Sequence, residues 1–105
     1  MEINIGREPQ KHGVFAEALE PLLSVIEAQP ELQLSGLMTI PPHTEDPARA
    51  LSYFTEMRNL RDAHGGARRL PNLSMGMSDD FSFAIEAGAT LVRVGTAIFG
   101  ERGKD

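Results

Sequence analysis

The 105-residue sequence contains no cysteine, which excludes disulfide bridges, thiolate metal sites and a thiol nucleophile. It has no apolar run near the ~20 residues that a transmembrane helix requires. Residues 1–5 show no basic segment followed by an apolar one, so no secretory signal is expected. Basic charge is also scarce, because 10 lysines and arginines stand against 15 acidic residues. We therefore expect a cytoplasmic protein whose partners include neither nucleic acid nor membrane.

Sequence signatures of common catalytic centres are missing as well. There is no P-loop, no G-x-G-x-x-G turn and no metal-binding histidine pair such as H-E-x-x-H. His12, His43 and His64 are scattered, and we expect all three to be exposed to solvent and to bind no metal. Only two lysines occur, Lys11 and Lys104. The residues themselves therefore predict no catalytic group and no metal site.

What is present is an alternation of strand and helix patterns typical of β/α units. Asp46 and Pro47 favour a helix start, and Gly65 with Gly66 favours its end. Short strands are expected near residues 3–5, 32–40, 73–77 and 90–94. Helices are expected at about 17–28, from 46 to about 64, and between the capping residues 78–80 and Gly88, with a helical turn at 97–99.

Strict alternation of this kind predicts an α/β fold with parallel strands joined by right-handed crossovers. No linker, repeat or low-complexity tract divides residues 1–105, so a single domain is expected. Two architectures fit the pattern. Four parallel strands can form a small open sheet covered on both faces, or one half of an eight-stranded β/α barrel.

Two successive strand ends carry residues that suit a phosphate, or a similar anion such as sulfate. Ser78 follows the third strand at a helix start, and Gly95 with Thr96 follows the fourth strand before a helical turn. Hydroxyl groups and backbone amides at such positions donate hydrogen bonds to anions. The structural alternative is that Ser78 is a helix cap and Gly95 a turn residue. Arg93, between two valines of the fourth strand, faces either the sheet interior or a surface ion pair.

Three stretches of the chain, residues 34–41, 73–81 and 92–100, contain the motifs S-G-L-M-T-I-P, S-M-G-M-S-D-D-F and R-V-G-T-A-I-F-G. In these the sequence resembles the pyridoxal phosphate homeostasis protein family, whose members are related to the N-terminal barrel domain of alanine racemase. The resemblance covers essentially the whole chain. It aligns the chain with the last four of eight β/α units, which is the C-terminal half of the barrel only.

The resemblance implies a partial β/α barrel that binds pyridoxal 5′-phosphate and buffers or delivers it without enzymatic turnover. It places the serine, the glycine and the threonine of the two turns around the cofactor phosphate and the arginine near the pyridine nitrogen. An arginine there keeps that nitrogen unprotonated, which weakens the electron sink used in most reactions of this cofactor. The cofactor-binding residues implied in this way are Met75, Gly76, Ser78, Arg93, Gly95 and Thr96.

The chain departs from the family at the aldehyde end of the site. The family's Schiff-base lysine follows the first barrel strand, and this segment is absent here. Lys11 corresponds to a loop lysine, and Lys104 lies near the end of the chain. Covalent capture of the cofactor by this chain alone is therefore not expected. Two other possibilities remain: a complementable half of a racemase-like enzyme, or a truncated product that has no ligand.

A half barrel would leave two unpaired strand edges and an apolar inner face in contact with water. We therefore expect two copies of the chain to associate as a dimer, or a missing N-terminal half of the barrel to be supplied by a partner.

Overall fold

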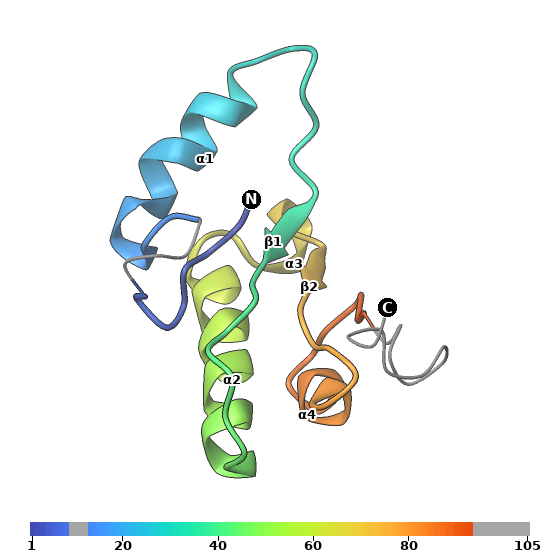
Figure 1. The fold of residues 1–105 in the computed structure, drawn as a ribbon. Helices are drawn as coiled ribbons and strands as arrows, with labels where there is room; N and C mark the ends of the chain where they lie inside the picture. Colours follow the sequence, from blue (N-terminus) through green and yellow to red (C-terminus); the bar gives the residue numbers. More distant parts are fainter. Residues whose placement is uncertain (9–12, 94–105) are drawn as a thin grey trace, which may run out of the picture.

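The structure of the chain is a computed structural model that describes residues 1–8 and 13–93 (Figure 1). Within these residues the helical elements are the 3₁₀ helix η1 and four α-helices, and two short β-strands lie between them. In chain order they are η1 (Ala16–Ala18), α1 (Leu19–Glu27), β1 (Gly36–Met38), α2 (Pro47–Ala63), α3 (Gly66–Arg69), β2 (Asn72–Ser74) and α4 (Phe81–Glu86). None of the helices in the described part of the chain has the length and apolar character needed to cross a membrane.

The two strands run parallel, in the register that pairs Leu37 with Leu73 and Met38 with Ser74. A single parallel bridge joins Glu2 to Met38 on one side, and another joins Ser74 to Leu91 on the other. The chain therefore has the α/β fold and the parallel strand direction that the sequence predicts. The expected four-stranded half barrel is not established, because the described residues contain two strands with single bridges beside them.

The sheet has a covered face and an open face. Leu37 and Leu73 lie opposite each other and are almost completely buried, together with Phe54 and Met57 of α2. Neighbouring residues along a strand point to opposite faces. The bridged row Glu2, Met38, Ser74 and Leu91 therefore lies on the other face, and these residues are partly or largely exposed. Leu91 keeps 55% of its surface accessible to water.

The helices start where local chemistry favours them. The Asp46 carboxylate accepts a hydrogen bond of 3.0 Å from the Ala48 amide, and Pro47 occupies the first turn of α2. Pro21 similarly lies in the first turn of α1. The short helix α3 is not expected from the sequence. It begins directly after α2 because Gly65 and Gly66 take positive φ values, 108° and 68°, that reverse the chain.

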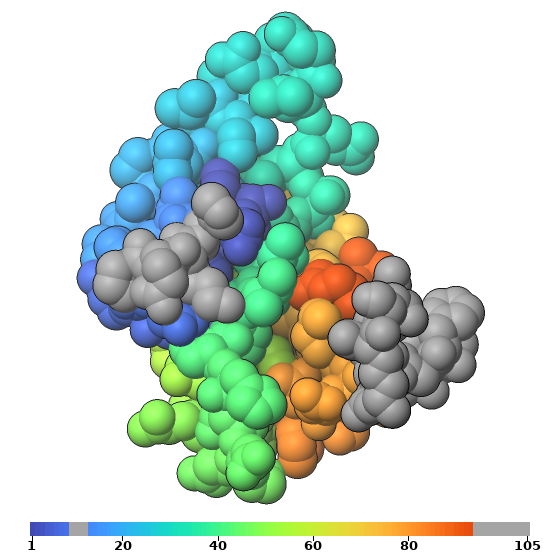
Figure 2. Space-filling view, in the orientation of Figure 1, coloured from blue at the N-terminus to red at the C-terminus, as the bar shows by residue number. Residues whose placement is uncertain are grey.

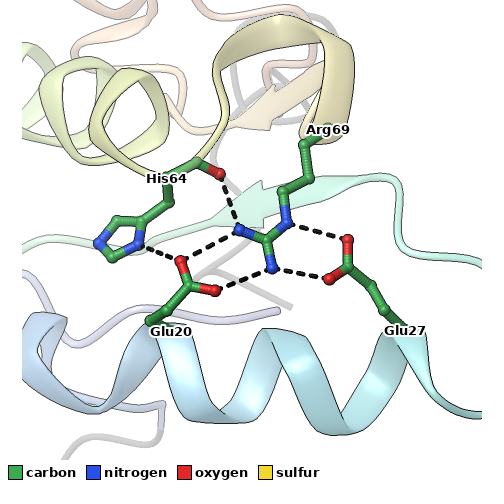
Figure 3. A network of polar contacts seen from close by, with 4 residues as sticks. All are labelled: Glu20, Glu27, His64 and Arg69. Carbon is green, nitrogen blue, oxygen red and sulfur yellow. Dashed lines mark hydrogen bonds and ion pairs between the residues drawn. The ribbon is translucent and has the colours of Figure 1, made fainter.

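A cluster of ion pairs joins α1 to the segment before β2 (Figure 3). The Arg69 guanidinium donates to both carboxylate oxygens of Glu20, at 3.0 and 2.9 Å, and to both of Glu27, at 2.9 and 2.7 Å. The His64 ring contacts Glu20 at 2.9 Å. Hydrogen bonds from Arg69 and then from His64 lower the pKa of Glu20 to about 2. The expectation that His64 is exposed to solvent is therefore wrong, because its side chain, 20% exposed, packs against this cluster.

Candidate functional site

Arg93 follows the bridge at Leu91 and reaches across the carboxyl ends of both strands. Its Nη1 donates to the Ser74 hydroxyl at 2.7 Å, its Nη2 to the Thr39 carbonyl at 3.3 Å, and its Nε lies 3.5 Å from the Met77 sulfur. Among the described residues Arg93 forms no ion pair with a carboxylate, so the surface ion-pair interpretation finds no support there. Three of the five guanidinium N–H groups meet these acceptors, which leaves two without one in this part of the chain.

The backbone under Arg93 is held by bonds between neighbouring segments. The Arg93 amide donates to the Gly76 carbonyl at 2.8 Å, and the Thr39 amide donates to the Ser74 carbonyl at 3.1 Å. The fully buried Thr39 hydroxyl donates to the Ile3 carbonyl at 2.7 Å. The carboxyl ends of β1, β2 and the two bridged segments therefore lie side by side, which is the edge where parallel sheets bind ligands.

Met75 and Gly76, predicted as neighbours of a ligand, have clear structural roles. The Met75 side chain is fully buried in the core on the covered face, on the opposite side of the sheet from Arg93. Its amide donates to the Leu91 carbonyl at 3.0 Å, so neither its side chain nor its amide is available to a ligand. Gly76 has a φ of 105°, and a Cβ there would approach the Ala84 side chain to 2.7 Å. The glycine is therefore required by the turn and by the packing of α4, with or without a ligand.

Ser78 lies in the turn between β2 and α4 and is partly buried. It is not the cap of α4, since that position is held by Asp80. The Asp80 carboxylate accepts a hydrogen bond of 2.8 Å from the Met77 amide and so closes the turn on itself. The alternative interpretation of Ser78 as a simple helix cap is therefore wrong.

A pocket of about 230 Å³ lies between this turn and the segment that follows β1. Figure 2 shows that segment, in green, running down the face of the molecule next to the orange residues of the β2–α4 region. Asp79 and Asp80 line the pocket on one side and His43 on the other. A phosphate dianion in the pocket would face two carboxylates, so this hollow is unsuited to a phosphate group.

Two residues of the predicted site and both lysines of the chain lie outside the described residues. Gly95 and Thr96 belong to residues 94–105, as does Lys104, and Lys11 belongs to residues 9–12. The prediction that the amides of Ser78 and Thr96 bind one anion therefore stays a prediction. The same holds for any role of the two lysines.

Ser74 and Thr39 are site residues that the sequence analysis did not select. A serine within a strand pattern carries no signal of its own, and only the register shows that its hydroxyl shares a face with Arg93. Thr39 is hidden in a mostly apolar stretch, where its contact with the Ile3 carbonyl depends on a pairing 36 residues away in the chain. Strand register is the missing information in both cases.

Known proteins similar to the chain include curated pyridoxal phosphate homeostasis proteins. The one from Aquifex aeolicus is 48% identical over 104 residues, which cover 97% of the chain and 46% of the relative. The one from Vibrio cholerae is 43% identical over 105 residues and is covered to 44%. The chain thus spans slightly less than half the length of these relatives.

Solved structures similar to the chain are likewise covered over about half of their length. PipY of Synechococcus elongatus without PLP superposes with a TM-score of 0.81 at 33% identity, over 95% of the chain and 48% of PipY. PipY with PLP bound gives a TM-score of 0.74 at 31% identity, over 94% of the chain and 49% of PipY. The profile of the family described as alanine racemase, N-terminal domain, matches residues 1–103. The chain therefore belongs to the alanine racemase N-terminal domain family.

Proposed function

We propose that the chain is a pyridoxal 5′-phosphate-binding unit of the cofactor-homeostasis type, which holds the cofactor without turning over a substrate. The observation that carries the proposal is the position of Arg93 over the carboxyl ends of the strands. Among the described residues its positive charge meets no carboxylate, and two of its N–H groups meet no acceptor. The names of the curated relatives and the PLP-bound structure of PipY support the choice of ligand.

In this proposal Arg93 lies against the pyridine ring of the cofactor. A guanidinium donates hydrogen bonds and accepts none, so it leaves the ring nitrogen unprotonated. When bound, the cofactor supplies an electron sink for reactions at amino-acid carbons, and an unprotonated ring nitrogen weakens that sink. The residue therefore favours a carrier over an enzyme.

The phosphate end of the site is assigned to Ser78, Gly95 and Thr96, with the backbone of Met75 and Gly76 beside them. The parallel bridge between Ser74 and Leu91 supports this assignment, because it sets β2 next to the segment that leads to Gly95 and Thr96. The hydrogen bond from the Arg93 amide to the Gly76 carbonyl continues that pairing toward the turns.

A racemase-like enzyme that works after complementation is the alternative function. It would need a lysine that bonds the cofactor and a second acid–base residue. The two lysines of the chain lie outside the described residues, and nothing in the described site supplies either role. We therefore prefer binding without turnover, and we keep the third possibility, a product without any ligand, as an outcome of the test.

The test compares pyridoxal 5′-phosphate with inorganic phosphate by thermal shift, absorbance spectra and trapping with borohydride. We expect both compounds to stabilise the chain, no covalent adduct to be trapped, and the stabilisation to be lost in Ser78→Ala and Thr96→Ala. Ser82→Ala on exposed α4 is the matched control and should behave like the wild type. A trapped adduct would favour the enzyme, and the absence of any shift would favour the product without a ligand.

We also propose that the chain corresponds to the last four β/α units of a barrel, and that a second copy covers its open face. The coverage of 44–49% of the relatives fits half of a barrel, and the motifs of the family resemblance are the reason for choosing its last four units. Leu91 and Ile40, 55% and 42% exposed, support the second, because apolar side chains at these positions gain from burial.

Sedimentation velocity tests this association. We expect a mass of twice 11.5 kDa that falls to the monomer in Leu91→Asp. Val25→Asp, at an equally exposed position on α1, is the control and should leave the mass unchanged. A folded monomer in the wild type would contradict the association, and a complex formed only after co-expression with an N-terminal barrel half would identify that half as the partner.

A further inference from the structure

Ser74 makes a short hydrogen bond with the end of the Arg93 side chain. The bond from Arg93 Nη1 to the Ser74 hydroxyl, at 2.7 Å, is the shortest of the three contacts that the guanidinium makes with described residues, and it joins β2 to the segment after Leu91. Hydrogen bonds to a charged group are stronger than those between neutral groups. An arginine side chain has many rotamers, so a strong partner at its end selects among them.

The position of Ser74 in the sheet explains why its hydroxyl is available for this contact. Ser74 pairs with Met38 and Leu91 in one row on the open face, while its neighbours Leu73 and Met75 point into the core. Its backbone carbonyl already accepts the Thr39 amide. The hydroxyl therefore projects from the open face toward the same edge as Arg93, two residues beyond Leu91.

The carbonyl of Thr39, the residue that follows β1, provides a second, weaker contact at 3.3 Å. Together the two acceptors hold the guanidinium on both neighbouring strands and use one N–H of each terminal nitrogen. Each terminal nitrogen keeps a second N–H group that meets no acceptor among the described residues. A ligand at the strand ends meets a donor pair that is already oriented, which lowers the entropy lost on binding.

We propose that Ser74 is a positioning residue for the pyridine end of the ligand site, acting through Arg93 and touching no ligand itself. This inference rests on the proposed function. It separates the two ends of the site: Ser74 affects a ligand that has the ring, whereas a ligand that is only a phosphate depends on the turns at Ser78, Gly95 and Thr96.

The test uses Ser74→Thr and Ser74→Val, which differ only in a hydroxyl against a methyl group and both suit a strand. Calorimetric titration measures the affinity for pyridoxal 5′-phosphate and for inorganic phosphate. We expect Ser74→Val to weaken pyridoxal 5′-phosphate binding about five- to tenfold, as for a lost hydrogen bond, and to leave inorganic phosphate binding unchanged. Ser74→Thr should bind both compounds like the wild type.

A double-mutant cycle shows whether the effect passes through Arg93. In the Arg93→Gln background, Ser74→Val should change the affinity for pyridoxal 5′-phosphate by no more than about twofold, since the charged donor is gone. The Arg93 Nε–H signal in NMR spectra gives a readout without any ligand, and it should broaden or shift in Ser74→Val but not in Ser74→Thr. Ser74→Ala replaces Ser74→Val if the latter does not fold by circular dichroism.

The possible failures are distinct. If the wild type binds neither compound, the proposed function is wrong and this inference falls with it. If the wild type binds pyridoxal 5′-phosphate and Ser74→Val binds it equally well, only the role of Ser74 is wrong. An equal loss for inorganic phosphate would assign Ser74 a general structural role and would also overturn the inference.

Discussion

Replacing Thr39 by valine should destabilise the chain although it makes the core more apolar. The Thr39 hydroxyl and the Ile3 carbonyl are buried, with 0% and 1% exposure of the two residues, and their hydrogen bond is 2.7 Å long. Valine keeps the shape of threonine but leaves the carbonyl without its partner. An unsatisfied buried group costs about 1–3 kcal/mol, which is a large share of a typical total of ~5–15 kcal/mol.

Urea unfolding followed by circular dichroism measures this loss, because the chain has no tryptophan for fluorescence. With a slope of about 1–3 kcal/mol per molar urea, a loss of ~2 kcal/mol lowers the midpoint by roughly 1 M. Thr39→Ser is the control, since it keeps the hydroxyl and removes one methyl group. We expect Thr39→Val to be less stable than Thr39→Ser. The opposite order, which apolar burial alone predicts, would refute the reasoning.

Three further predictions concern the helices and turns. Arg69 lowers the pKa of Glu20 to about 2, below its usual value of 4.5. This ion pair therefore stabilises the fold above pH 4.5, and the stabilisation is lost as the pH falls toward 2. In unfolding curves recorded at several pH values, Arg69→Met should remove the loss of stability that the pair causes between pH 4.5 and 2. In thermal melts, Gly76→Ala should lower the melting temperature more than Gly66→Ala does. Both glycines have positive φ, which costs an alanine about 1–2 kcal/mol, but a Cβ at Gly76 would also meet the Ala84 side chain, whereas nothing lies within 4 Å of a Cβ at Gly66. Equal losses would show that packing against α4 is unimportant. Asp46→Ala should lower the free energy of unfolding by about 1 kcal/mol, because α2 loses its cap, and Asp46→Asn should keep most of the wild-type stability. If the cap has no effect, the two variants will be equally stable.

The helices were the part of the fold most accessible from the sequence. The Asp46–Pro47 pair predicts the start of α2 because capping and proline preference act within one turn. The periodic apolar residues predict α1 within two residues at its start and one at its end. Helix α3 escaped prediction because Gly65 and Gly66, strong signals for a stop, here also begin the next helix.

The strands were harder to predict from the sequence than the helices, because the limits of a strand depend on pairing partners distant in the chain. The pattern predicts a strand over 32–40, but only Gly36–Met38 is paired. Its partner β2 begins at Asn72, directly after Pro71, which has no amide hydrogen to donate. Strand length is thus set by the neighbour, which local sequence does not reveal.

The site was predictable to the extent that its residues follow strand ends. Alternation with its valine neighbours left Arg93 either in the sheet interior or in a surface ion pair, and only the family resemblance placed it at the ligand site. The structure brings its side chain to the carboxyl ends of the strands. The roles of Met75 and Gly76 could not be separated from core packing by motif alone, because burial and φ values are properties of the folded chain. The role of Ser74 could be recognised only once the strand register was known.

The bridge between Ile3 and Val14 has a consequence for how the sheet can grow. The Val14 amide donates to the Glu2 carbonyl at 3.0 Å, and the Asn4 amide donates to the Val14 carbonyl at 2.9 Å, so the outer rim of the first segment is occupied by the chain itself. An incoming strand must break both bonds before it can dock on this side. A larger barrel that closes through Ile3 would therefore need Val14 to separate from this segment first. The rate at which such a barrel closes would depend on how often Val14 separates.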